Sequence, residues 1–96
     1  MKVYFTSKAR NDILQLVKYV TDEIKMPETA LTYADKMKEF ADKTIGGTHS
    51  AFSICRNNFL ALQNLKCATF DKKWVFAFKV IKNKVVIFHV INGKLL

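Results

Sequence analysis

The fold is decided near the C-terminus, where residues 74–81 have the sequence WVFAFKVI and residues 85–91 have the sequence VVIFHVI. Both stretches consist almost entirely of apolar residues, many of them β-branched or aromatic, and therefore favour strands. The polar residues 71–73 and 82–84 that precede and separate them suit turns. A third strand is predicted upstream, over residues 62–70. The C-terminal part of the chain is therefore expected to form an antiparallel meander.

The beginning of the chain predicts a short strand over residues 2–5 and then a helix. Thr6 or Ser7 can cap this helix, because their hydroxyl groups accept hydrogen bonds from the free amides of the first turn. The helix should extend to about Lys25. Its apolar residues recur at steps of three and four along one stripe, which consists of Ala9, Ile13, Leu16, Val17, Val20 and Ile24.

A second helix is predicted to begin at Pro27, since proline suits the first helical position. Gly46-Gly47 predicts its end, and its apolar stripe consists of Ala30, Tyr33, Ala34, Met37, Phe40, Ala41 and Ile45. Only one or two residues separate the two helices, so they must fold back as a hairpin. Residues 48–60 show no clean period and predict a long loop or irregular edge.

The predicted order is β, α, α, loop, β, β, β within 96 residues. A chain of this length has room for one hydrophobic core, so residues 1–96 are expected to form a single domain. Helices on one face of a mostly antiparallel sheet define a two-layer α+β fold. No apolar run reaches the roughly 18 to 20 residues that a membrane span needs. We therefore expect no membrane association and a soluble, cytoplasmic protein.

The residues on each face of the sheet depend on strand register, and a slip of one residue would exchange the faces. We expect a three-residue loop at residues 82–84, which would turn one set of residues toward the helices: Leu65, Cys67, Trp74, Phe76, Phe78, Val80, Val86, Phe88 and Val90. The opposite face would then carry Lys66, Lys79 and His89, with Ala68, Ile87 and Ile91 beside them. A two-residue turn would instead align Phe76 with His89.

Charge is distributed unevenly along this basic chain, whose formal net charge is +8. Residues 1–46 carry eight basic and seven acidic side chains, whereas residues 47–96 carry eight basic side chains and the single acid Asp71. A field of one sign favours an anionic partner, such as a nucleic acid or an acidic polypeptide.

Cys55 and Cys67 are the only cysteines, which are too few for a disulfide framework. They lack CxxC spacing, and we expect them to be buried, reduced thiols. His49 and His89 lack the helical spacing of a metal-binding pair, so neither a metal nor another cofactor is expected. The basic half also lacks a phosphate-binding glycine loop and paired carboxylates for acid–base chemistry.

Apart from residues 48–62, the chain resembles the RelE/ParE superfamily, the toxins of type II toxin–antitoxin systems that are often labelled plasmid stabilization proteins. The likeness rests on the order of elements and on three stretches, TSKARNDILQLVKYV, PETALTYADKM and KKWVFAFKVIKNKVVIFHVINGKLL. It implies growth inhibition, either at the ribosome as an mRNA interferase or through DNA gyrase. It also implies neutralisation by a cognate antitoxin, which the basic surface predicts to be acidic.

Carried over position by position, the resemblance places the aromatic and basic run of the family's penultimate strand at Trp74, Phe78 and Lys79. Val75 stands where the family's ribosome-dependent ribonucleases have an arginine. The closing segment has Asn92 and Lys94 in place of the family's histidine and arginine. Leu95 and Leu96 end the chain where those ribonucleases have a terminal tyrosine or histidine.

Cleavage of RNA in such a site would need cationic stabilisation of the phosphate and a proton shuttle. Lys66, Lys79 and His89 form the candidate catalytic set for these roles. The candidate residues for binding a target or nucleic acid are the other basic side chains of this half, Arg56, Lys72, Lys73 and Lys94.

Two kinds of function remain open from the sequence. The first is a toxin, with or without endoribonuclease activity. The second is a non-catalytic binding module, either an inactivated toxin or a basic domain that binds an acidic protein or a nucleic acid. General nucleic-acid binding would explain the charge, but the sequence has no recognition-helix motif and no signature of base-stacking aromatic residues.

Overall fold

The sheet of the computed structural model, which describes residues 1–96, has four strands in the order β1-β4-β3-β2. The predicted antiparallel meander is formed by β2 (Lys66–Phe70), β3 (Trp74–Ile81) and β4 (Lys84–Asn92). The N-terminal strand β1 (Val3–Phe5) pairs parallel with β4. This arrangement places β4 and β3 at the centre of the sheet, with β1 and β2 at its edges.

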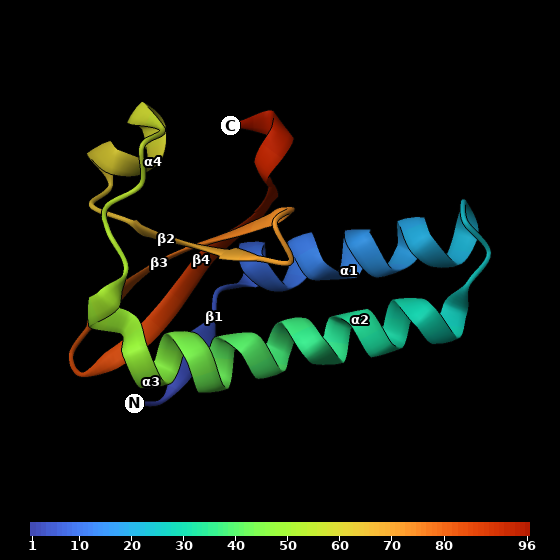
Figure 1. Ribbon diagram of the computed structural model, residues 1–96, viewed down its shortest axis with the longest axis horizontal. Helices are drawn as coiled ribbons and strands as arrows, with labels where there is room; N and C mark the ends of the chain where they lie inside the picture. The colour runs from blue at the N-terminus through green and yellow to red at the C-terminus, as the bar shows by residue number, and fades with distance from the viewer.

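Two antiparallel helices, α1 (Ser7–Asp22) and α2 (Pro27–Glu39), cover one face of the sheet (Figure 1). The hydroxyl of Thr6 accepts a hydrogen bond from the Ala9 amide at 3.1 Å, so the predicted cap of α1 is confirmed. α1 ends before Lys25, which has a left-handed φ of 60°. The two-layer α+β fold and the helical hairpin are therefore as predicted. No helix is long and apolar enough to span a membrane.

The expected end of the second helix at Gly46-Gly47 is wrong, because the chain continues through a π-helical segment η1 (Phe40–Ile45) into α3 (Gly46–Thr48). Gly46 serves close packing instead. A Cβ atom at this position would lie 3.0 Å from the Met1 carbonyl oxygen and 3.0 Å from a methyl carbon of Val3. The glycine thus lets the helical layer approach β1 closely.

The segment predicted as a long loop contains two short helical pieces, η2 (His49–Ala51) and α4 (Asn58–Leu62). The side-chain oxygen of Asn57 caps α4 by accepting a hydrogen bond from the Leu60 amide at 3.2 Å. The third predicted strand consequently starts at Lys66 and not at Leu62. α4 lies on the side of the sheet opposite the helical hairpin (Figure 1).

The turn between β3 and β4 has two residues, not the expected three, since Ile81 pairs with Lys84. Lys82 and Asn83 have φ values of 49° and 63°, as a hairpin turn with two left-handed residues requires. A β-bulge then shifts the register.

The bulge falls at Phe88, because Phe78 pairs with Ile87 whereas Ala77 pairs with His89. Phe76 therefore pairs with Val90, as the longer loop would have arranged.

The bulge decides which residues form the main core beneath the helices. Phe76 and Phe78 are buried there as predicted, together with Val90. Val85 and Ile87 also face the helices, so the assignment of Val86 and Phe88 to this side is wrong. Val80, also expected in the core, is 38% exposed. On β2 the expected faces are reversed, since Ala68 packs in the main core while Leu65 and Cys67 pack on the opposite side.

Cys55 and Cys67 form a disulfide, with their Cα atoms 5.0 Å apart, so the expectation of reduced thiols is wrong. The cysteines meet because residues 53–55 run antiparallel to residues 65–67. The Cys55 amide donates to the Leu65 carbonyl at 2.9 Å, and the Cys67 amide donates to the Ser53 carbonyl at 3.1 Å. This pairing across 12 positions had no signal in the cysteine spacing.

Candidate functional site

We call the sheet face that α1 and α2 leave uncovered the far face; its small buried cluster consists of Cys55, Leu60, Leu65 and Ala77, with Cys67, Phe88 and Ile91 packed against it. Lys79 and His89 both belong to this face, because their neighbours Phe78 and Val90 point into the main core. Lys66 pairs directly with Phe78 and therefore lies on the helix side. The structure brings together two of the three candidate catalytic residues.

The ammonium group of Lys79 is held between α4 and the bulge. Its Nζ donates a hydrogen bond to the carbonyl oxygen of Gln63, at the end of α4, at 3.3 Å. The same Nζ lies 5.7 Å from the ring centre of Phe88, within the range of a cation–π interaction. Because the bulge turns Phe88 to the far face, it supplies this lysine with an aromatic neighbour.

His89 lies beside an exposed aromatic residue of α4, with 6.4 Å between its ring centre and that of Phe59. Burial lowers the pKa of His89 below its usual value, and the positive charge of Lys8 lowers it further, against the opposing effect of Asp12. The imidazole is therefore neutral at neutral pH and can accept a proton. Together, Lys79 and His89 provide a cation and a proton acceptor on one surface.

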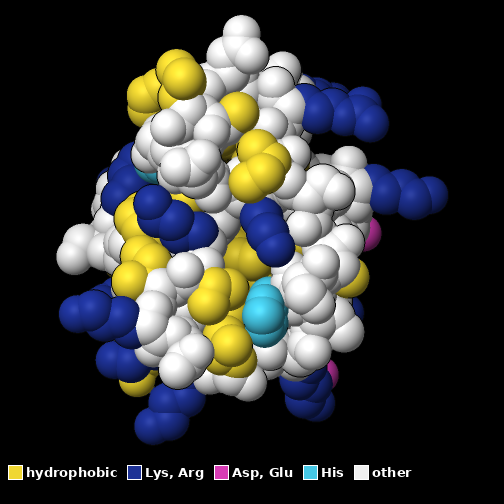
Figure 2. Space-filling model, turned by 90° about the vertical axis from the view of Figure 1, so that its left-hand side faces the viewer, with side chains coloured by type: hydrophobic (Ala, Val, Ile, Leu, Met, Phe, Trp, Pro, Cys, Tyr) yellow, Lys and Arg dark blue, Asp and Glu magenta, His cyan; other side chains and the backbone are white.

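The four candidate binding residues are all exposed but lie on different elements. Arg56 precedes α4, Lys72 and Lys73 form part of the β2–β3 turn, and Lys94 lies in the C-terminal turn η3 (Gly93–Leu95). The side of the molecule in Figure 2 shows many lysine and arginine side chains, with exposed hydrophobic groups among them and very little acid. The basic half of the sequence thus contributes to a broad basic surface and not to one compact cluster.

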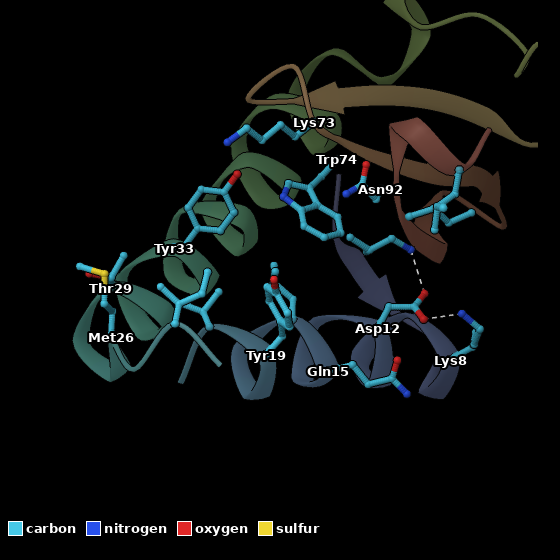
Figure 3. A pocket seen from close by; sticks show the side chains of 16 residues that line it. Lys8, Asp12, Gln15, Tyr19, Met26, Thr29, Tyr33, Lys73, Trp74 and Asn92 are labelled. Atoms are coloured by element: carbon cyan, nitrogen blue, oxygen red, sulfur yellow. Dashed lines mark hydrogen bonds and ion pairs between the residues drawn. The ribbon is translucent and has the colours of Figure 1, made fainter. Parts of the chain in front are cut away.

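A second feature, which the sequence analysis did not identify, is a groove of about 780 Å³ between the helical hairpin and the sheet. We call it the interhelical groove. Tyr19 from α1, Tyr33 from α2 and Trp74 from β3 surround it (Figure 3). Ten of its sixteen lining residues are hydrophobic, and Tyr19 is 57% exposed. In the sequence, Tyr19 and Leu95 could have indicated this groove, since both are large hydrophobic residues that lie outside the predicted core.

One wall of the interhelical groove is fixed by the Tyr33 hydroxyl, which donates a hydrogen bond to the Asp71 carboxylate at 2.8 Å. Burial, followed by the hydrogen bond to Asp71 and the negative charge of Asp71, raises the pKa of Tyr33 to about 12, against a smaller lowering effect of Trp74. The phenol therefore remains a donor at physiological pH. This bond joins α2 to the β2–β3 turn, where Asp71 was predicted.

The other end of the groove is fixed by Asp12, whose carboxylate accepts a hydrogen bond from the Val90 amide at 3.0 Å (Figure 3). β1 covers the edge of β4 only as far as Ile87, and Thr6 then bonds the carbonyls of Ile87 and Phe88. The next free backbone group along this edge is the Val90 amide, which donates to Asp12. The same carboxylate also pairs with Lys8. α1 is thereby attached directly to the strand that carries His89.

No group of three or more metal-ligating side chains occurs in the structure. On the far face, Lys79 and His89, with the neighbouring aromatic rings, are the side chains available for binding and proton transfer.

No model of a protein family matches this sequence, and no curated protein matches it either. Among solved structures, the chain is similar to one from the chromosomal ParDE toxin–antitoxin system of P. aeruginosa, with a TM-score of 0.78 and 17% sequence identity. The match covers 96% of this chain and 95% of the other. The likeness confirms the RelE/ParE-like fold that the resemblance in sequence implied.

Proposed function

We propose that this protein is the toxin component of a toxin–antitoxin system, which inhibits growth and is neutralised by an acidic antitoxin. The observation that carries the proposal is the shared fold over nearly the whole chain with a protein of a ParDE toxin–antitoxin system. The excess of basic residues in the second half supports a partner of opposite charge.

The interhelical groove is the surface best suited to the antitoxin. It exposes Tyr19, Ile24, Met26 and Leu95 together in one groove, and exposed apolar side chains that lie together mark interaction surfaces. An amphipathic segment can bury an apolar face in such a groove. Lys73 lines the same groove and would favour an acidic residue in that segment, whereas the charge of Lys8 is paired with Asp12.

The far face is the surface proposed to act on the cellular target. Val75, at the position of the family's arginine, is buried in this face and provides no cation. This favours inhibition by binding, as ParE-type members inhibit DNA gyrase, over cleavage of mRNA at the ribosome. Cleavage remains the second candidate because neutral His89 and cationic Lys79 share the surface, and a proton acceptor beside a cation suits phosphate chemistry.

The test of the toxin proposal is induced expression in bacteria, with growth, amino-acid incorporation and plasmid supercoiling followed together. Growth arrest that begins with a change in supercoiling supports the gyrase mechanism, whereas an early loss of protein synthesis supports mRNA cleavage. Normal growth in cells that contain folded protein would overturn the toxin proposal and favour a non-catalytic binding module.

The antitoxin site is tested by a matched pair of variants on α1, with the acidic product of a neighbouring gene as the partner. Tyr19→Glu places a charge in the interhelical groove and should weaken binding at least about 10-fold, as expected for a central aromatic contact. Leu14→Glu changes a residue that is 64% exposed and outside the groove, and should leave binding unchanged. Equal binding by both variants would exclude the groove as the docking site.

A further inference from the structure

The Cys55–Cys67 disulfide borders a surface pocket of about 530 Å³ on the far face. Cys55 is only 4% exposed, whereas Cys67 is half-buried and is reached from the pocket. Arg56 also lines this pocket, and no acidic side chain does. A small molecule can therefore approach the disulfide beside the Arg56 side chain.

The segment that the disulfide closes has few other attachments. Of the five residues of α4 only Leu60 is buried, while Phe59 is 66% and Leu62 is 85% exposed. A helix this short is not stable without tertiary support. The disulfide and the short antiparallel pairing beside it are therefore the main constraints on α4.

The same segment covers the two candidate residues of the far face. The Gln63 carbonyl accepts the hydrogen bond of Lys79, and the Phe59 ring lies against His89. Leu60 and Leu65 pack with Ala77 in the small cluster of the far face. Loss of the constraint on α4 would thus free both Lys79 and His89.

We propose that Cys55–Cys67 is a site of thiol–disulfide exchange with a low-molecular-weight thiol, and that its reduction releases α4 and uncovers Lys79 and His89. The exchange and the release of α4 do not depend on the proposed toxin function. Only the effect of uncovering Lys79 and His89 on a cellular target rests on it. Disulfides are usually reduced in the cytosol and persist in oxidising surroundings. In the cytoplasm expected for this protein, the bond would hold α4 closed only under oxidising conditions.

The exchange proceeds in two balanced steps. The thiolate of the small molecule attacks one cysteine sulfur, the Cys55–Cys67 bond breaks, and a mixed disulfide and a protein thiolate form. A second small thiol attacks the mixed disulfide, so the small molecule leaves as its oxidised dimer. Both cysteines end as thiols with the protons of the two reductant molecules. The Arg56 guanidinium stabilises the thiolates that approach and leave.

Hydrogen exchange followed by mass spectrometry tests the release in the whole chain. In reduced glutathione, amides of residues 53–67 should exchange at least about 10-fold faster than in oxidised glutathione, while those of β3 and β4 stay protected. The Cys55→Ser/Cys67→Ser variant should show fast exchange of this segment in both solutions. Unchanged exchange on reduction, or equal loss of protection throughout the chain, would overturn the proposal.

The pocket is tested by the rate at which glutathione reduces the oxidised protein. Arg56→Gln should slow reduction about 5-fold at low salt, since it removes one nearby positive charge. Lys82→Gln, a matched change in the exposed β3–β4 turn, should leave the rate unaltered. Equal rates for both variants would contradict the role of Arg56. Neither experiment measures toxicity, so the proposal can fail or succeed independently of the toxin function.

Discussion

The two faces of the sheet are stabilised in different ways. The helix side buries a cluster of ten residues that includes Phe76, Phe78 and Met37. The buried cluster of the far face has only four residues, and this face holds a short helix mainly through one disulfide and the short strand pairing beside it. Extensive packing makes an element open only with the whole fold, whereas a sparsely packed element can open locally. The far face is therefore the side on which the molecule can change without unfolding.

A single β-bulge produces much of this difference. It lets Val85, Ile87 and Val90 all reach the main core, although their spacing along β4 is not regular. It also turns the consecutive residues Phe88 and His89 to the far face. The bulge thus completes one core and furnishes the opposite face with an aromatic and a titratable side chain.

The largest expected effect is on the helix side. Phe76→Ala should lower the free energy of unfolding by about 3 to 5 kcal/mol, because it removes a fully buried ring and leaves a cavity. The matched change Phe59→Ala on the far face should cost within about 0.5 kcal/mol, since this ring is mostly exposed. Urea unfolding measures both. Similar losses for the two variants would show that the two faces do not differ as described.

A smaller loss is expected at the edge of β4. Asp12→Ala leaves the Val90 amide without its acceptor, and Val90 is almost fully buried, so unfolding should become easier by about 1 to 3 kcal/mol. Asp12→Asn keeps an acceptor oxygen and should recover most of this stability. If the two variants are equally unstable in urea, the charge of Asp12 beside Lys8 matters and the hydrogen bond does not.

The hairpin of β3 and β4 shows how far the sequence could predict the fold. Near the turn the pairing follows the two-residue alternative, and beyond the bulge it follows the pairing expected from the longer loop. Almost every residue from Val85 to Ile91 is apolar, so the pattern carries no mark of the position where the two alternatives exchange. The strands were therefore predictable, whereas the faces were predictable only in part.

The site depended on information that local patterns do not contain. The sequence assigned Lys79 and His89 to the correct face of the sheet, because each is adjacent in the chain to a residue of the main core. Lys66 was misplaced because the faces of β2 depend on its pairing with β3. The disulfide required the pairing of residues 53–55 with 65–67, and the interhelical groove required the position of two helices relative to Trp74. These are tertiary contacts, which periodicity along the chain does not report.

A pH effect of modest size is expected from His89. Its pKa is lowered in the folded state, chiefly by burial, so the unfolded chain binds a proton more readily. The stability that follows is present above the unfolded pKa of about 6.5 and is lost as pH falls through the folded value. The melting temperature should therefore drop on acidification below about pH 6.5, and less so in His89→Gln. His49→Gln, a control away from the far face, should keep the wild-type dependence.

The smallest effect on stability is expected from replacing Lys79 or Lys66, the two lysines that the sequence analysis placed on one face. The same two variants should differ most clearly in growth inhibition. Lys79→Ala should change the free energy of unfolding by within about 0.5 kcal/mol, because the lysine is only partly buried and its hydrogen bond to Gln63 is long. It should nevertheless weaken growth inhibition, since the proposed target surface loses its cation. Lys66→Ala, on the helix side, should leave growth inhibition unchanged. Thermal melts and growth curves of both variants decide the matter: equal toxicity of the two would remove Lys79 from the site, and a loss confined to Lys66→Ala would assign the active surface to the side of the sheet that carries the helices.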